Sequence, residues 1–183
     1  MRSVKKLTLA SVCIALCVVL PIAFHMIPNA GSILLPMHIP VLLCGLVCGW
    51  QYGLICGVLG PVLSSVLTGM PPAAILPAMI VDLGFYGCVS GLMMERVHTG
   101  NLYADLYISL PVAMLVGRVA SGIAKALIFA PGTTFAVWAT ASFVTALPGI
   151  LVQLIVLPNL IVALTRASLI PARYKRVRKG IVG

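Results

Sequence analysis

Long runs of apolar residues dominate the chain, and short segments rich in proline, glycine and polar residues separate them. A helix needs about 20 predominantly apolar residues to cross the hydrocarbon core of a bilayer. Backbone groups in lipid must bond to one another, which permits only helices and closed barrels, and the strands of a barrel alternate polar with apolar residues. Because these runs are apolar at consecutive positions, the pattern predicts membrane-spanning helices.

The runs predict an all-α, six-helix transmembrane bundle that forms a single integral membrane domain over residues 1–183. The expected helices are about 7–27, 39–49, 53–67, 73–94, 103–129 and 135–164. The first run is too long for the apolar part of a typical secretory signal, so we expect it to be retained. The last run contains Pro148 and Pro158, which can bend a helix because proline lacks the N–H donor. The second run is short for a span, and the alternative is one kinked helix over 39–67, which would give five helices.

Composition and charge agree with this prediction and orient it. The chain is 61% hydrophobic and 8% charged, whereas soluble domains carry about 25% charged residues, so a soluble protein is excluded. Of the twelve Lys and Arg residues, Arg118 and Lys125 lie inside a predicted helix. With six helices, all the others fall on one side of the membrane: Arg2, Lys5, Lys6, Arg96, Arg166, Arg173, Lys175, Arg176, Arg178 and Lys179.

Basic residues concentrate on the cytoplasmic side of membrane proteins. We therefore expect both termini in the cytoplasm and the protein in the cell membrane, with a short N-terminal segment and a basic tail from about residue 166. Five helices would place the two basic ends on opposite sides. The net charge of +9 is thus interpreted as a topology signal and not as a sign of nucleic-acid binding.

Glycine recurs at every fourth position in the stretch Gly45-Leu-Val-Cys-Gly49-Trp-Gln-Tyr-Gly53-Leu-Ile-Cys-Gly57. Lipid provides no hydrophobic drive for helices to associate, so close packing must stabilise them, and small residues at positions i and i+4 let two backbones approach. The spacing therefore predicts a close helix contact in this region.

The six cysteines all lie in apolar runs, and no two of them form a C-x-x-C pair. Cys13 and Cys17 are one helical turn apart, as are Cys44 and Cys48, a spacing that would suit a metal, but we interpret them as small packing residues. The sequence carries no G-x-S-x-G, H-E-x-x-H or P-loop motif and no paired carboxylates. We therefore expect no catalytic residues, no metal site and no cofactor.

Asp82, Arg118 and Lys125 are charged residues predicted to lie deep within helices, whereas Glu95 and Asp105 lie near the inner face. Insertion of one charged residue at the centre of a membrane helix costs about 2.5–3.5 kcal/mol. Because that cost must be offset, such residues are functional candidates. At about 1.5 Å per residue, Asp82 lies about 13 Å from the outer end of its helix, between Lys125 at about 6 Å and Arg118 at about 16 Å. Two interpretations stay open: a structural salt bridge or triad, and a cation, Lys125 above all, that is free to bind an anionic or polar ligand.

Polar residues and prolines gather in the loops expected outside. Among them, His38 could hydrogen-bond a ligand as a neutral ring or pack against its own turn. Tyr86, inside the helix expected over 73–94 and one turn from Asp82, could stack on an aromatic ligand. The candidate substrate-binding residues are Asn29, His38, Asp82, Tyr86, Arg118 and Lys125.

The order of these pieces resembles a family. A first helix with small residues, a proline-rich loop, the stretch LPMHIPVLLCGLVCGWQYGLICGVLGPVLSSVLTGMPP and a helix with a buried acid look like the substrate-binding S component of energy-coupling factor (ECF) vitamin transporters. The resemblance implies six helices that capture a vitamin near the outer face. It implies lid loops over 28–38, 68–72 and 130–134, with Ser32, Met37, Met70 and Thr133 as lid residues. It also implies a membrane coupling subunit and two cytoplasmic ATPases as partners, the coupling subunit docking on a small-x-x-x-small pair of helix one, here Ser11 and Ala15 in place of two alanines.

The ligand remains a choice between two classes. A free Lys125 favours a carboxylate such as pantothenate, whereas His38, Asp82 and Tyr86 suit a pyrimidine or pyridine vitamin precursor. The two buried cations against one buried acid favour pantothenate. Two other functions stay open: a secondary transporter or channel that acts alone, and a membrane assembly or scaffold protein without a tight small-molecule ligand.

Overall fold

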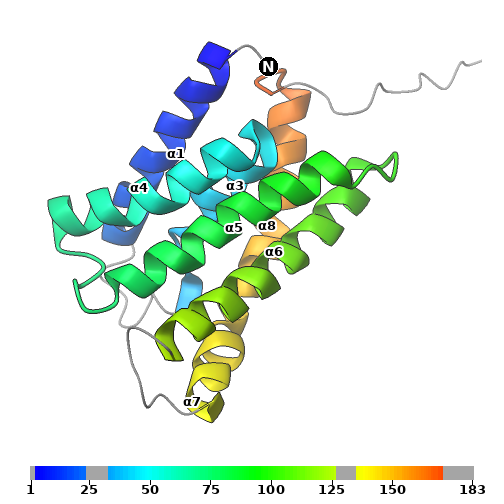
Figure 1. Ribbon diagram of the computed structural model, residues 1–183. Helices are drawn as coiled ribbons and strands as arrows, with labels where there is room; N and C mark the ends of the chain where they lie inside the picture. The colour runs from blue at the N-terminus through cyan, green and yellow to red at the C-terminus, as the bar shows by residue number, and fades with distance from the viewer. Residues whose placement is uncertain (1–2, 24–32, 127–134, 171–183) are drawn as a thin grey trace, which may run out of the picture.

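A computed structural model describes residues 3–23, 33–126 and 135–170, and every regular element in those ranges is helical (Figure 1). This confirms the all-α prediction. The elements, in order, are α1 (Ser3–Ala23), α3 (His38–Cys48), α4 (Trp50–Thr68), α5 (Leu76–Arg96), α6 (Leu102–Ala124), α7 (Phe135–Ala139), the π-helix η2 (Thr140–Thr145) and α8 (Leu147–Arg166). The predicted ends at residues 24–27 and 127–129 lie outside the described residues.

Five of the helices, α1, α4, α5, α6 and α8, are long and apolar enough to cross a bilayer. The eleven residues of α3 span about 16 Å at 1.5 Å per residue, about half the 30 Å of a hydrocarbon core. The structure therefore supports a multi-pass membrane protein, while a sixth crossing that includes α3 stays a prediction.

The chain reverses between α3 and α4 at Gly49, whose φ of 101° lies in a region that favours glycine. The reversal is tight: a Cβ built on Gly53 would lie 2.7 Å from the Cα of Gly45, although the two residues would be about 12 Å apart in one continuous helix. The alternative of a single kinked helix over 39–67 is therefore wrong. Trp50, expected in a connection between helices, instead begins α4.

Close backbone contact joins α3 and α4 to α5. Added Cβ atoms on Gly45 or Gly53 would collide with the backbone of Gly87, and one on Gly57 would lie 2.6 Å from the carbonyl carbon of Leu83. We call Gly45, Gly53, Gly57 and Gly87 the glycine seam. The small-residue prediction is confirmed at these positions, whereas Gly49 forms the turn.

Buried cysteines fill the space between α1, α3 and α4. Cys13, Cys17, Cys44, Cys48 and Cys56 all belong to the apolar core, which confirms their interpretation as packing residues. The thiol of Cys17 donates a long hydrogen bond of 3.8 Å to the backbone carbonyl of Met37.

The last apolar run is broken and does not form the single bent helix expected over 135–164. It consists of α7, the π-helix η2 and α8, with Ala146 between the last two. Pro148 lies in the first turn of α8, where its missing N–H donor costs nothing, while Pro158 lies inside α8. The proline at 148 thus begins a helix and does not bend one.

One end of the bundle collects the start of α1, the α3–α4 turn and the α5–α6 turn (Figure 1). The Lys6 ammonium lies 5.9 Å from the centre of the Tyr52 ring, and a Cβ on Gly49 would lie 2.9 Å from a carboxylate oxygen of Glu95. Asp105 is fully buried here and accepts hydrogen bonds from the backbone N–H and the hydroxyl of Thr99 at 2.8 and 2.7 Å. Lys6 and Glu95 thus mark one end of the molecule, which we call the basic end.

Candidate ligand site inside the bundle

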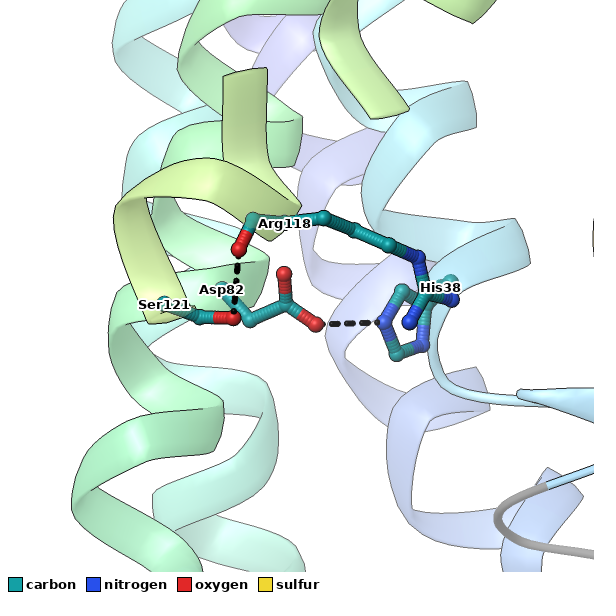
Figure 2. Close-up of polar contacts among 4 residues, drawn as sticks. All are labelled: His38, Asp82, Arg118 and Ser121. Carbon is teal, nitrogen blue, oxygen red and sulfur yellow. Dashed lines mark hydrogen bonds and ion pairs between the residues drawn. The ribbon is translucent and has the colours of Figure 1, made fainter. Parts of the chain in front are cut away.

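His38 and Asp82 form a largely buried pair between the first residue of α3 and the interior of α5 (Figure 2). The His38 Nε2 atom lies 3.1 Å from the Asp82 Oδ2 atom, and their side chains are 2% and 15% exposed. An ionised carboxylate can only accept hydrogen bonds, so the Nε2–H group of His38 is the donor of this hydrogen bond. In the neutral ring the Nδ1 atom is then an acceptor.

Tyr86 packs edge-on against this histidine, with ring centres 4.9 Å apart and an angle of 83° between the planes. The Tyr86 ring also lies against Gly117 on α6, where any Cβ would collide with it. Glycine at position 117 therefore lets α6 approach α5 closely enough to bring Arg118 beside the pair.

Arg118 extends from α6 toward the His38–Asp82 pair (Figure 2) and is 6% exposed. The ion pair that the sequence allowed between Asp82 and Arg118 is not formed among the described residues, because Asp82 bonds to His38 instead. Within that part of the chain the Nε and Nη2 atoms of Arg118 have no hydrogen-bond partner. These two donors form one edge of the guanidinium, and such an edge matches both oxygens of a carboxylate.

We call His38, Asp82, Tyr86 and Arg118 the polar cluster. Each residue presents at least one buried polar atom with no hydrogen-bond partner in the described ranges: His38 Nδ1, Asp82 Oδ1, Tyr86 OH, Arg118 Nε and Arg118 Nη2. A buried polar group without a partner costs about 1–3 kcal/mol. The cluster is therefore a set of donors and acceptors suited to a polar ligand.

The cluster lies toward the end of the bundle opposite the basic end. Asp82 is six residues from the start of α5 at Leu76, and Arg118 is six residues from the end of α6 at Ala124; each distance is about 9 Å. His38 is the first residue of α3, which runs from the cluster to Gly49.

Lys125 follows α6 directly as its C-cap and is partly buried. It lies two turns beyond Arg118, as its sequence position predicts, and forms no ion pair with any residue that the structure describes. Met37 is buried in the core just before α3, and Met70 lies in the α4–α5 turn, where its N–H donates to the Thr68 hydroxyl at 3.2 Å. Asn29, Ser32 and Thr133 lie outside the described residues.

Ser11 and Ala15, the predicted partner contact, are both exposed on α1. The Ser11 hydroxyl donates to the backbone carbonyl of Leu7 at 3.0 Å. This bond satisfies the hydroxyl within its own helix, so the surface around it is effectively that of a small apolar stripe.

Three buried polar residues on α6 and α8 were absent from the predicted set. Ser121 donates to the Arg118 carbonyl at 3.3 Å (Figure 2). Ser109 on α6 and Gln153 on α8 are fully buried. Their signal in the sequence is weak, because a neutral polar residue in an apolar run carries no charge to mark it; Gln153 is nevertheless the sole amide in the stretch 147–158.

An apolar helical bundle with a polar cluster in its interior is the architecture of a multi-pass membrane protein that handles a polar solute. Residues 5–162 match the family model described as "ECF transporter, substrate-specific component". The chain therefore belongs to the family of ECF transporter substrate-specific components, as its sequence pattern indicated. Comparison with curated proteins and with solved structures gave no match.

Family membership fixes the general role. The chain is a substrate-capture subunit of an ECF importer, a membrane transport protein for vitamin uptake and not an enzyme, and it works with an ECF module. Of the three function classes that the sequence left open, family membership supports the substrate-capture subunit over a transporter that acts alone and over a scaffold protein.

Proposed function

We propose that this subunit captures pantothenate, or a closely similar small carboxylate, in the polar cluster. The observation that carries the proposal is the Nε–Nη2 edge of Arg118, which is buried and has no partner among the described residues. A buried guanidinium edge whose N–H donors lack acceptors is costly, and a ligand carboxylate supplies both acceptors.

The other members of the cluster match the rest of such a ligand. Pantothenate carries an amide and hydroxyl groups as well as its carboxylate. The Tyr86 hydroxyl can donate or accept, His38 Nδ1 accepts in the neutral ring, and Asp82 Oδ1 accepts. We further propose Lys125 as a second cation that attracts the carboxylate, and Asn29 as a polar contact.

The position of the cluster supports capture from outside the cell. Basic residues favour the cytoplasmic face, and Lys6 with the α5–α6 turn lies at the end opposite the cluster. In this orientation six crossings, with α3 and the segment before it as the second, place both termini in the cytoplasm. Ser32, Met37, Met70 and Thr133 then belong to segments on the outer side, which would cover the ligand.

The exposed α1 stripe at Ser11 and Ala15 is the proposed contact with a membrane coupling subunit. Two cytoplasmic ATPases complete the importer in this proposal. A small-residue surface suits such a contact because close packing of helices is the main stabilising term in lipid.

A heteroaromatic vitamin precursor, a pyrimidine or a pyridine, is the second candidate. It is favoured by the edge-on pair of His38 and Tyr86, since two rings at an angle leave faces on which a flat ligand can stack.

Gentle purification followed by mass spectrometry of co-purified small molecules tests the proposal directly. In parallel, the melting temperature is measured against pantothenate, nicotinate, nicotinamide and a hydroxymethylpyrimidine. Pantothenate is expected to raise the melting temperature most. Stabilisation by the pyrimidine or a pyridine compound alone would replace the first candidate by the second, and stabilisation by none of the four would reject both.

A further inference from the structure

Gln153 is an uncharged residue on the inner face of α8, and burial of its amide lowers the stability of the fold unless the amide is hydrogen-bonded. That face includes Gly149, Gln153, Leu157 and Ile161, which are spaced four residues apart and buried. The side chain of Gln153 is 0% exposed, and neither its Oε1 nor its Nε2 atom has a hydrogen-bond partner among the residues that the structure describes.

The neighbours of α8 direct this face toward the start of α3. The helix packs against α3 and α6. A Cβ on Gly149, one turn before Gln153, would lie 2.9 Å from the carbonyl carbon of Leu34, and the chain continues from Leu34 to His38 within four residues. Because Gln153 follows Gly149 by four residues, its side chain leaves α8 on the same face, toward the segment that positions His38.

A purely structural role does not account for this amide. Structural glutamines inside helical bundles bond to neighbouring side chains or carbonyls, whereas burying an amide unpaired costs about 1–3 kcal/mol relative to an apolar residue of the same shape. Leu157, one turn further along the same face, shows that an apolar side chain packs well there. A buried amide that lacks partners among the described residues and leaves α8 toward the segment before His38 has the properties of a binding residue.

We propose that Gln153 is a further ligand-binding residue, which reaches the site from α8 and determines specificity. The ligand class is then a small carboxylate that also carries a neutral hydrogen-bonding group, an amide or a hydroxyl: Arg118 binds the carboxylate, and the Gln153 amide, as donor and acceptor, binds the neutral group. This inference rests on the proposed function, because it concerns the same site.

Gln153→Met tests it, because methionine has nearly the same volume and no strong hydrogen-bonding group. Two quantities are measured on the purified full chain: the melting temperature without added ligand, and the affinity for pantothenate. We expect the melting temperature to stay or rise and the affinity to fall about 10- to 100-fold, the effect of losing hydrogen bonds to a buried partner. Gln51→Met is the matched control, since Gln51 is the chain's other glutamine and is exposed in the first turn of α4; both of its values should equal those of the unchanged protein.

Two results would overturn the inference. Unchanged affinity in Gln153→Met would show that the ligand does not reach the amide, while the proposed function would stand. A melting temperature that falls by several degrees without ligand would assign the amide a structural role. If the unchanged protein binds none of the vitamins tested, the proposed function fails and this inference fails with it, an outcome distinct from unchanged affinity in Gln153→Met alone.

Discussion

The glycine seam and the polar cluster occupy adjacent positions on α5, but they differ in packing and in hydrogen bonding. Leu83 and Gly87 meet the backbones of α3 and α4, while Asp82 and Tyr86, one residue earlier in each case, meet His38 and α6. At the seam, backbone lies against backbone with no room for a methyl group. In the cluster, polar atoms stay without partners in the described part of the chain. The seam thus fixes the helices against one another, whereas the cluster leaves donors and acceptors unpaired among the described residues.

The largest expected effect comes from breaking the seam. In Gly87→Val, side-chain atoms would have to occupy the space of the Gly53 backbone, whose Cα would lie 3.0 Å from an added Cβ. Since backbone cannot rotate away, we expect a loss of more than about 3 kcal/mol, at or beyond the upper end of overpacking costs. Size-exclusion profiles and melting curves in detergent measure this outcome.

Gly84→Ala is the matched control on the same helix, because its Cβ would meet the nearest atom, a methyl of Leu54, at an ordinary 3.5 Å. It should change stability by no more than about 1 kcal/mol and in the favourable direction, as alanine favours helices. Equal behaviour of the two variants would contradict the close contact at the seam.

The second effect is confined to the cluster. In Arg118→Met, the carboxylate of pantothenate loses two charge-assisted hydrogen bonds, so we expect an affinity loss of about 100-fold or more, from about 1.5–3 kcal/mol for each such bond. Panthenol, in which an alcohol replaces the carboxylate, is the comparison ligand. Titration of both compounds should show that the preference of the unchanged protein for pantothenate disappears in the variant. A preference that survives would mean that Arg118 does not bind the carboxylate.

How far the sequence predicts this comparison depends on the kind of residue. Asp82 and Arg118 were recognisable because a charge inside an apolar run is costly, whatever the fold. The actual partner of Asp82 was not recognisable from the sequence. It is His38, which is 44 residues away in the sequence and reaches Asp82 through the chain reversal at Gly49. Gln153 was not predicted as a site residue because one neutral amide barely changes the hydropathy of its apolar run.

The glycine repeat shows how far sequence spacing alone can predict the fold. Helical spacing correctly predicted close packing at Gly45, Gly53 and Gly57, but spacing alone did not distinguish a glycine needed for contact from one needed for a turn. The positive φ of Gly49 is a property of the backbone that the apolar pattern does not encode. The same holds for the π-helix η2, which interrupts a run that is apolar on both sides.

The third effect is a smaller loss of stability at this turn. Gly49 has φ 101° and ψ 169°, a region that is essentially limited to glycine, so Gly49→Ala should cost about 1–3 kcal/mol. Gly69, with φ 72° and ψ 5°, lies in the left-handed helical region, and a Cβ there would meet no atom within 4 Å. Gly69→Ala should therefore cost less, about 1–2 kcal/mol, and denaturation curves of the two variants provide the comparison. The reverse order would contradict the described reversal between α3 and α4.

The smallest expected effect belongs to Lys125, and it separates the two cations that share a face of α6. Lys125 lies seven residues, about 10 Å along the helix, beyond Arg118, and it caps α6 and is less buried than Arg118. In Lys125→Met the fold should survive and the affinity for pantothenate should fall about 3- to 10-fold, because the cation attracts the carboxylate over a distance without being its main partner. Lys125→Arg keeps the charge and should keep the affinity, and raising the salt concentration should narrow the difference between Lys125→Met and the unchanged protein, since salt weakens exposed charges more than buried ones. An unchanged affinity in Lys125→Met would remove this residue from the site and leave the buried Arg118 as the cation that selects the ligand.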